Sequence, residues 1–435
     1  MVKEPHMRAG FAQRDITPPV GVEMEGFNRP DPARSVHDPL KVRALALRQE
    51  EREAAIVAVD LLFYERGAMD RLKGHIARRL GLLPQQVLVN FSHNHSGPRV
   101  SRWHYSGAPS EHYLRLVETR LIEAIREARQ EIRPVCLEAT MGRSRLPLSR
   151  RRINEEGEAT WGPAPSQPVC RALPLCVFRD APDSVLACVF SISCHPTINH
   201  APVLSAEYPG VAVRRLNEHF GTDGCLFLQG AGGDAKPLNI ADGEIWQDDA
   251  GFDAVEDAGR IVAEDVIAAA GRLQAVEPDL RYDLTEARFA LKPAPKPSTF
   301  RVIRDHPEIS EHRKRWAAEM LQIIEIHGTP PTHVPLLVHG MVLGKNVRMI
   351  GVEAELGSEL GEQLISACGE GVTFPLGYTN GSRINLPCDR QLPQGGYGVD
   401  TSWEYHWPSR LAPGVDEALE KAVRRIDGPS GRPVD

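Results

Sequence analysis

The stretch at residues 87–98 constrains the fold of this chain more than any other and reads Val-Leu-Val-Asn-Phe-Ser-His-Asn-His-Ser-Gly-Pro. An apolar run typical of a buried strand ends abruptly in His93 and His95. α/β proteins often place functional residues in such loops at strand ends. Residues i and i+2 of a strand share a face, so both imidazoles, common metal ligands, would point into one pocket. If the pair stood alone, two solvated loop histidines would be the simpler interpretation. A metal site therefore requires further ligands from other segments of the chain.

Three further strand-like runs end in polar residues. Residues 184–193 lead into Cys-His195-Pro, residues 225–228 into Gln-Gly-Ala-Gly-Gly-Asp, and residues 349–352 into Glu353-Ala-Glu355. The glycine cluster lacks the Lys-Ser/Thr of a P-loop and the spacing of a Rossmann turn, which excludes both kinds of nucleotide site. Two histidines and a carboxylate with an open position suit a catalytic zinc ion, and the glycines would let backbone N–H groups approach a reacting oxygen.

The order of the expected elements predicts an α/β fold, with a mixed β-sheet core covered by helices. A β-β-α-β order at the start indicates that the sheet is not purely parallel. Strands are expected at 42–48, 54–62, 87–91, 281–291, 333–343, 347–353 and 372–378, and helices at 66–81, 111–132, up to 220, 253–273, 309–327, 357–369 and 415–427. Within residues 8–27, Asp15, Pro18, Pro19 and Gly21 indicate a rigid non-helical turn. A single domain is expected over 1–435, with a linker-like surface excursion at 292–299 and a flexible tail at 428–435.

Composition narrows the class of protein. Hydrophobic residues make up 42% and charged residues 25% of the chain, as in ordinary globular proteins. The net charge of -7 argues against nucleic-acid binding. Neither a signal segment nor an apolar run of about 18 residues is visible, which predicts a cytoplasmic protein without membrane insertion. The eight cysteines form no Cys-x-x-Cys pair and are expected to be reduced. The expected partner is a small-molecule substrate, and assembly into a homo-oligomer stays open.

Several motifs together resemble the neutral/alkaline, non-lysosomal ceramidase family, specifically its catalytic N-terminal domain in short bacterial relatives. They occur in the family's order. The matching segments are Gly10…Asp15-Ile-Thr-Pro-Pro19, His37-Asp-Pro-Leu40, Asn90-Phe-Ser-His-Asn-His-Ser-Gly-Pro98, Cys194-His-Pro-Thr197, Ser205-Ala-Glu-Tyr-Pro-Gly210, Leu228-Gln-Gly-Ala-Gly-Gly-Asp234 and Gly377-Tyr-Thr-Asn380. The resemblance implies a neutral-ceramidase-like domain and a zinc-dependent hydrolase that cleaves an amide with a metal-activated water.

The resemblance also implies a site. One zinc ion, or another divalent metal, would be held by His93, His195 and Glu355, with Glu353 as the alternative carboxylate. His95 would contact the substrate or transfer protons. The remaining expected catalytic residues are Asp234 and Arg151, and the expected substrate-binding residues are Arg150, Arg152, Gln229, Gly230, Lys236 and Tyr378. The backbone of residues 229–233 or an arginine would stabilise the oxyanion.

Departures from the family concern the substrate. Where the family has a serine after Gly-Asp, this chain has Ala235 and Lys236, and Lys236 would instead hold an anionic group. The family's tyrosine ligand is replaced by Ser382 and Asn385, so the Asn385 amide oxygen or water would take that position. No C-terminal β-sandwich domain is expected.

These departures argue against membrane ceramide and favour a small polar amide. The alternatives are a metal-dependent hydrolase or isomerase acting on an ester, lactone or sugar-type substrate, and a non-catalytic member of the family that binds a ligand. Asp60 is expected to orient a histidine, and the aromatic run at 403–407 is interpreted as packing.

Overall fold

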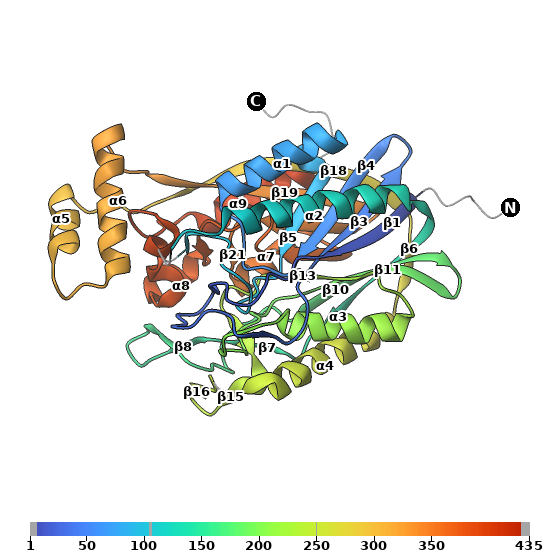
Figure 1. Cartoon of the computed structure of the whole chain (residues 1–435), viewed down its shortest axis with the longest axis horizontal. Coiled ribbons are helices and arrows are strands. Elements are labelled where there is room, and N and C mark those ends of the chain that lie inside the picture. Colours follow the sequence, from blue (N-terminus) through green and yellow to red (C-terminus); the bar gives the residue numbers. More distant parts are fainter. Residues whose placement is uncertain (1–6, 104–106, 249, 428–435) are drawn as a thin grey trace.

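The computed structural model describes residues 7–103, 107–248 and 250–427 (Figure 1). The expected tail at 428–435 lies outside these residues. No helix among the described residues is long and apolar enough to cross a membrane. All eight cysteines are free; seven are buried, and Cys136 is exposed.

The larger of two main sheets contains nine strands in the order β13-β11-β10-β6-β1-β3-β4-β5, with β17 also paired to β6. Its strands are β1 (Met7–Asp15), β3 (Lys41–Gln49), β4 (Arg52–Val59), β5 (Val87–Phe91), β6 (Arg133–Arg143), β10 (Ala172–Ala181), β11 (Ser184–Ile192), β13 (Cys225–Gln229) and β17 (Gln274–Val276). The pairs β4–β5 and β11–β13 are parallel and the other pairs are antiparallel, so the expected mixed sheet is confirmed.

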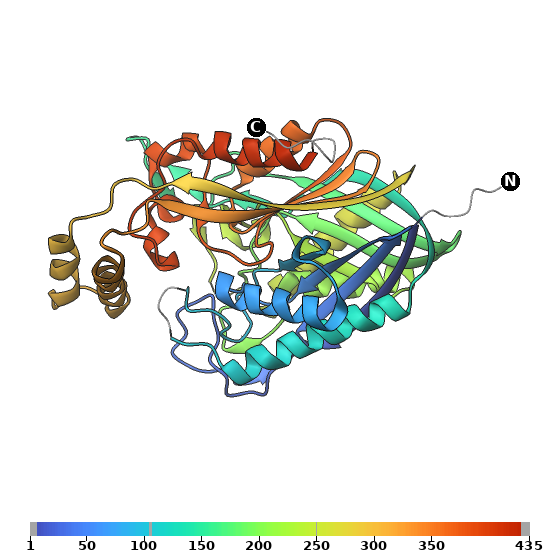
Figure 2. The same ribbon diagram turned by 90° about the horizontal axis from the view of Figure 1, so that it is seen from above.

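The second main sheet has the order β18-β19-β20-β22 and packs face to face against the first (Figure 2). Its strands are β18 (Pro278–Ala290), β19 (His333–Gly344), β20 (Val347–Val352) and β22 (Val372–Leu376). Successive side chains of a strand point to opposite faces of its sheet, so each strand contributes to two layers of the core. Leu45 and Leu47 of β3 pack toward Met349 and Phe374 of the second sheet, whereas Val42 faces the helices.

Helices cover the outer faces of both sheets. The helices α1 (Arg66–Leu80) and α2 (Glu111–Gln130) lie on one half of the large sheet, and α3 (Glu207–Phe220) and α4 (Gly251–Ala270) lie on the other half. The second sheet is covered by α7 (Ser358–Cys368) and α9 (Val415–Asp427). Ser110 caps α2 by accepting a hydrogen bond from Tyr113 N at 3.4 Å.

Short elements lie around the ends of the two sheets. The strands are β2 (Ser35–Val36), β7 (Pro147–Ser149), β8 (Arg151–Ile153), β9 (Ala159–Trp161), β12 (Val203–Leu204), β14 (Ala235–Pro237), β15 (Ala241–Asp242), β16 (Ile245–Trp246), β21 (Glu355–Leu356) and β23 (Asn385–Leu386). The 3₁₀ turns are η1 (Pro84–Gln86), η3 (Leu238–Ile240), η4 (Asp389–Gln394) and η5 (Ser402–Tyr405), and α8 (Tyr397–Asp400) is a single helical turn.

The segment at 292–332 is a larger excursion than the sequence predicts. Its linker-like start leads into α5 (Pro297–Asp305) and α6 (Glu311–His327), which project from the body at one end (Figure 1). The two helices share a small apolar cluster of their own, centred on Phe300 and Trp316. No strand was predicted before residue 42, but Met7–Asp15 form β1 in the middle of the large sheet, and the predicted non-helical turn follows it.

The two edge strands of the large sheet approach each other, although they are farthest apart in strand order. Asn90 at the end of β5 accepts a hydrogen bond from Gln229 N at 2.7 Å, and its Nδ2 donates to Gln229 O at 3.3 Å. The same Nδ2 donates to Gly377 O, just after β22, at 2.8 Å. The side-chain amide of Asn90 therefore connects the C-terminal ends of β5 and β13 in the large sheet and of β22 in the second sheet. Each of these strands pairs in parallel with its neighbour.

Candidate metal centre

Three histidines meet at these strand ends. His93 and His95 follow β5, and His195 follows β11; potential ligand atoms of all three lie within 4.8 Å of one another. All three side chains are buried, and the Nε2 atoms of His93 and His95 are 3.0 Å apart. The solvated-loop interpretation is therefore wrong for these residues.

The carboxyl group of Glu355 completes the cluster. Glu355 begins β21, and its two oxygens lie 3.6 Å from His93 Nε2 and 3.3 Å from His195 Nε2. The alternative carboxylate, Glu353, faces elsewhere: it is paired with Arg66 and accepts a hydrogen bond from Leu337 N. The geometry thus distinguishes two glutamates that the sequence leaves open.

Tyrosine hydroxyls orient Glu355 from two sides. Tyr405 donates to Oε1, and Tyr378 donates to Oε2 at 3.3 Å. Asn385, paired with Glu355 in the short β21–β23 ladder, directs its Nδ2 to the Tyr405 hydroxyl at 3.5 Å. Asn385, which was expected to take a ligand position, therefore lies beside the cluster. The Tyr405 hydroxyl lies between its side chain and Glu355.

The histidines are held as neutral imidazoles. His195 Nδ1 faces two carbonyl oxygens, Gly232 O at 2.6 Å and Ala235 O at 3.2 Å, so Nδ1 carries the proton and Nε2 presents its lone pair to the cluster. Burial lowers the pKa of His93 to about 3 and holds the pKa values of His95 and His195 well below their usual range. Neutral imidazole is the form that binds metal ions.

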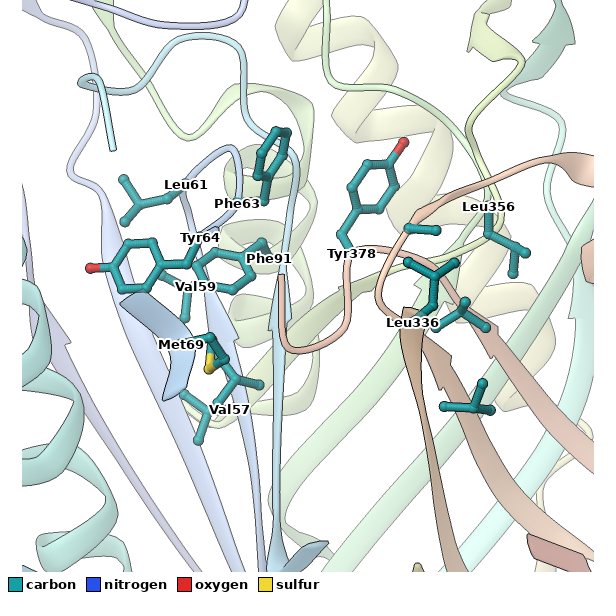
Figure 3. Packing of buried hydrophobic residues seen from close by; sticks show 14 of the residues in the cluster. Val57, Val59, Leu61, Phe63, Tyr64, Met69, Phe91, Leu336, Leu356 and Tyr378 are labelled. Carbon is teal, nitrogen blue, oxygen red and sulfur yellow. The ribbon is translucent and has the colours of Figure 1, made fainter. Parts of the chain in front are cut away.

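Backbone strain gathers at the same place. His93 has a φ of 59° and Tyr378 a φ of 49°, in the left-handed region that non-glycine residues rarely occupy. His95 packs against Gly26, where an added Cβ would lie 2.5 Å from the imidazole Cγ. Phe63 and Phe91 lie on one side of a buried hydrophobic cluster, and Tyr378 and Leu356 lie on the other (Figure 3).

A small pocket opens beside Glu355. It is lined by Arg150, Arg151, Ala159, Thr160, Trp161, Gly233, Asp234, Glu355, Gly357, Asn385, Leu386, Pro387, Gln391, Tyr397 and Gly398. Of the expected catalytic and substrate-binding residues, Arg150, Arg151 and Asp234 thus line it. Arg151 donates to Gln394 and to Gly395 O, and burial lowers its pKa.

Asp234 has a structural task in this wall. Its Oδ1 accepts hydrogen bonds from the N–H and hydroxyl of Ser358, at the start of α7, and its Oδ2 accepts from Gln391 at 3.1 Å. Arg152 lies outside the lining and forms an ion pair with Glu244 at 2.8 Å. Asp60 pairs with Arg43 and not with a histidine, so that expectation is wrong.

Four backbone N–H groups of the glycine loop already have acceptors within the protein. Gln229 N donates to Asn90, Gly230 N to Ile192 O, Gly232 N to Gly230 O and Gly233 N to Leu356 O. The glycines instead permit close packing: a Cβ on Gly233 would lie 2.8 Å from Glu355 O. Gln229 and Gly230 are buried and do not line the pocket, whereas Arg150 and Arg151 do.

Sequence reasoning missed three aromatic residues of the site. Tyr405 lies in the run that was interpreted as packing, and Trp161 and Tyr397 form part of the pocket wall. The sequence did contain a signal for Tyr405, since it is a tyrosine within an aromatic run that was expected to be buried. A buried tyrosine needs a hydrogen-bond partner for its hydroxyl. No motif marks the other two.

The fold and the cluster define a mixed α/β protein with a buried three-histidine group that could hold a metal ion. Its fold is that of neutral ceramidase. The crystal structure of neutral ceramidase from Pseudomonas aeruginosa matches 98% of this chain and 74% of its own, with a TM-score of 0.73 and 15% sequence identity. A structure of ceramidase complexed with C2 matches 98% of this chain and 75% of its own, with a TM-score of 0.74 and 15% identity. No family model and no curated protein matches the chain.

Proposed function

We propose that this chain is a metal-dependent hydrolase of a small polar amide, in which His93, His195 and Glu355 hold one divalent ion, most simply zinc. One observation carries the proposal. A buried carboxyl lies within 3.6 Å of two neutral imidazoles, and no described cation forms an ion pair with it. Lone pairs that converge in this way are stabilised by a bound cation.

Each residue of the proposed centre would have a distinct role. His195 is fixed by two carbonyls, and Glu355 is fixed by two tyrosine hydroxyls. The bound ion would supply Lewis-acid activation of water and of the scissile carbonyl. His95, whose Nε2 is 3.0 Å from that of His93, would hold the proton that passes to the leaving nitrogen. Arg150 or Arg151 would face the developing oxyanion from the pocket wall.

The fold similarity supports a hydrolase, while the chain's own residues argue for a substrate other than ceramide. The serine and tyrosine of the family motifs are absent, and a buried lysine stands after Asp234–Ala235. Esters, lactones and sugar-type substrates are the second class to assay.

Metal analysis of purified protein tests the centre. We expect about one divalent ion per chain in the wild type, and its loss in His93→Ala, His195→Ala and Glu355→Gln. His306→Ala, on the exposed α5–α6 connection, is the control and should keep the ion. A panel of amides, esters and lactones with and without chelator then identifies the bond. Folded wild-type protein that takes up no ion would contradict the proposal and favour the non-catalytic alternative.

A further inference from the structure

Two buried cations stand beside the proposed centre without a carboxylate partner. Arg150 and Lys236 have relative exposures of 6% and 3%. Arg150 Nη2 donates to Gly233 O at 2.7 Å, and neither side chain forms an ion pair with a described residue. Burying a charge is costly unless an opposite charge or hydrogen bonds compensate it. Neither cation therefore has a carboxylate in direct contact among the described residues, and the more distant carboxylates of Asp248 and Glu207 only partly offset the burial of Lys236.

The other lysine that is buried in the described part of the chain shows how a lysine with a structural role is bonded. Lys73 is 7% exposed and donates to two backbone carbonyls, Pro84 O and Val87 O. Lys236 has no hydrogen-bond acceptor among the described residues. Its Nζ lies over ring faces instead, 5.6 Å from the centroid of Trp161 and 5.2 Å from that of Trp246. Aromatic faces attract a cation but leave its donors available.

The two cations are brought together by a short antiparallel ladder. Lys236 of β14 is opposite Leu148 of β7, and Arg150 N donates to Asp234 O one step further along. Lys236 and Arg150 are thus diagonal neighbours, which point to the same face of such a ladder. The Arg150 guanidinium lies 4.8 Å from the Trp161 ring centroid, so both cations share one aromatic wall. Arg150 and Glu355 line the same pocket.

We propose that Arg150 and Lys236 form a subsite for a carboxylate carried by the substrate, so that the hydrolysed amide is a small anionic one. This assignment rests on the proposed hydrolase function. A carboxylate offers two oxygens, which match one guanidinium edge and one ammonium. A phosphate is normally held in a cradle of backbone N–H groups, whereas the Gly232 and Gly233 amides are already bonded.

Direct binding tests the subsite without turnover. The probes are N-acetylglycine and its neutral counterpart N-acetylglycinamide, measured by calorimetry on the chelator-treated wild-type protein, in which the proposed hydrolysis does not proceed. We expect at least a tenfold preference for the carboxylate. Lys236→Met and Arg150→Met should bring the ratio near one, and Lys236→Arg should retain part of it. Arg152→Met is the matched control, because Arg152 already pairs with Glu244, and should keep the full preference.

The outcomes separate the subsite from the hydrolase proposal. Equal affinities for the two probes in the wild type would overturn the subsite even if neutral amides are hydrolysed, and this comparison does not depend on any variant folding. A preference that survives both methionine variants would also overturn it. Inorganic phosphate that binds more tightly than N-acetylglycine would overturn the carboxylate assignment. A carboxylate preference in the chelator-treated protein would support the subsite even where no hydrolysis is found.

Discussion

Tyr405 is the residue whose part in the centre was least visible in the sequence. Its hydroxyl reaches Glu355 Oε1 from a segment 50 positions further along the chain. The family resemblance implies a tyrosine in the region where this chain has Ser382 and Asn385, and here a tyrosine from a different loop contacts the carboxylate. A single sequence gives no signal for such a contact, because it depends on the path of the loop between α8 and α9.

Removing this hydroxyl should weaken the centre. In Tyr405→Phe the ring would remain and Oε1 of Glu355 would lose its donor, so we expect metal affinity to fall by about 10- to 100-fold. Competition with a metal-sensitive dye measures it. Tyr378→Phe removes the longer, 3.3 Å hydrogen bond to the other oxygen and should have a smaller effect. Equal metal affinity in wild type and Tyr405→Phe would contradict a positioning role.

Glu25 should make stability depend on pH. Burial raises the pKa of this carboxyl from 4.5 to about 7, although it accepts hydrogen bonds from Val100 N and Ser101 N. The folded state thus binds a proton that the unfolded state releases between these values. Stability is fully present below pH 4.5 and is lost as the pH rises through 7, by roughly 3 kcal/mol in total.

Glu25→Gln keeps the shape of the neutral carboxyl and cannot ionise. Urea unfolding at pH 5 and pH 8 should show the wild type losing stability relative to this variant. If the free energy of unfolding changed equally with pH in the two proteins, Glu25 would already be ionised in the folded state at pH 5, which would contradict this prediction.

At the scale of elements, the sequence predicted most of the fold because periodicity records which faces are buried. The helix expected at 66–81 is Arg66–Leu80, and the strand expected at 333–343 is His333–Gly344. β1 was missed because Asp15 and the prolines after it dominate the pattern, while Arg8, Gln13 and Arg14 place polar side chains on both faces of the strand. The site loops escaped prediction for another reason. Their conformations depend on contacts between distant segments, as when Asp234 caps α7.

The packing of α3 against α4 can be tested through one glycine. A Cβ on Gly259 of α4 would lie 2.4 Å from Val211 Cβ of α3. Gly259→Ala should therefore push the helices apart and cost about 1–3 kcal/mol, despite the better helix propensity of alanine. Gly74→Ala in α1 is the matched control. Its nearest neighbour is the flexible Arg78 side chain at 3.4 Å, so it should gain about 0.5–1 kcal/mol. Thermal unfolding measures both, and a stabilised Gly259→Ala would contradict this packing.

At the scale of the whole molecule, the centre exists because two sheets and both edges of the larger one meet at a single end. His93 follows β5, His195 follows β11, and Glu355 follows β20. The sequence predicted polar residues at these strand ends but not that they converge. Convergence depends on strand order, and the order β13-β11-β10-β6-β1-β3-β4-β5 cannot be derived from periodicity.

Asn90 is the residue through which this convergence can be tested. Its amide donates to Gln229 O and Gly377 O, and its Oδ1 accepts from Gln229 N, so it joins β5 to β13 and to the end of β22. In Asn90→Asp an acceptor would replace the donor that faces two carbonyls. We expect a loss of roughly 3–5 kcal/mol in urea unfolding, with weaker metal binding at temperatures where the protein remains folded. Asn90→Ala leaves the carbonyls unpaired without adding an acceptor and should cost about 1–3 kcal/mol.

Asn239→Ala provides the comparison for Asn90, because its amide makes a single hydrogen bond, to Ala254 O at 2.8 Å, away from the strand ends. It should cost about 1 kcal/mol and leave metal binding unchanged. The informative quantity is the coupling between stability and metal affinity. If the strand ends are held together through Asn90, stability and metal affinity both fall in the Asn90 variants. In Asn239→Ala stability falls and metal affinity does not change. Asn90→Asp that loses stability while binding the ion as tightly as the wild type would show that the histidines converge independently of the sheet edges.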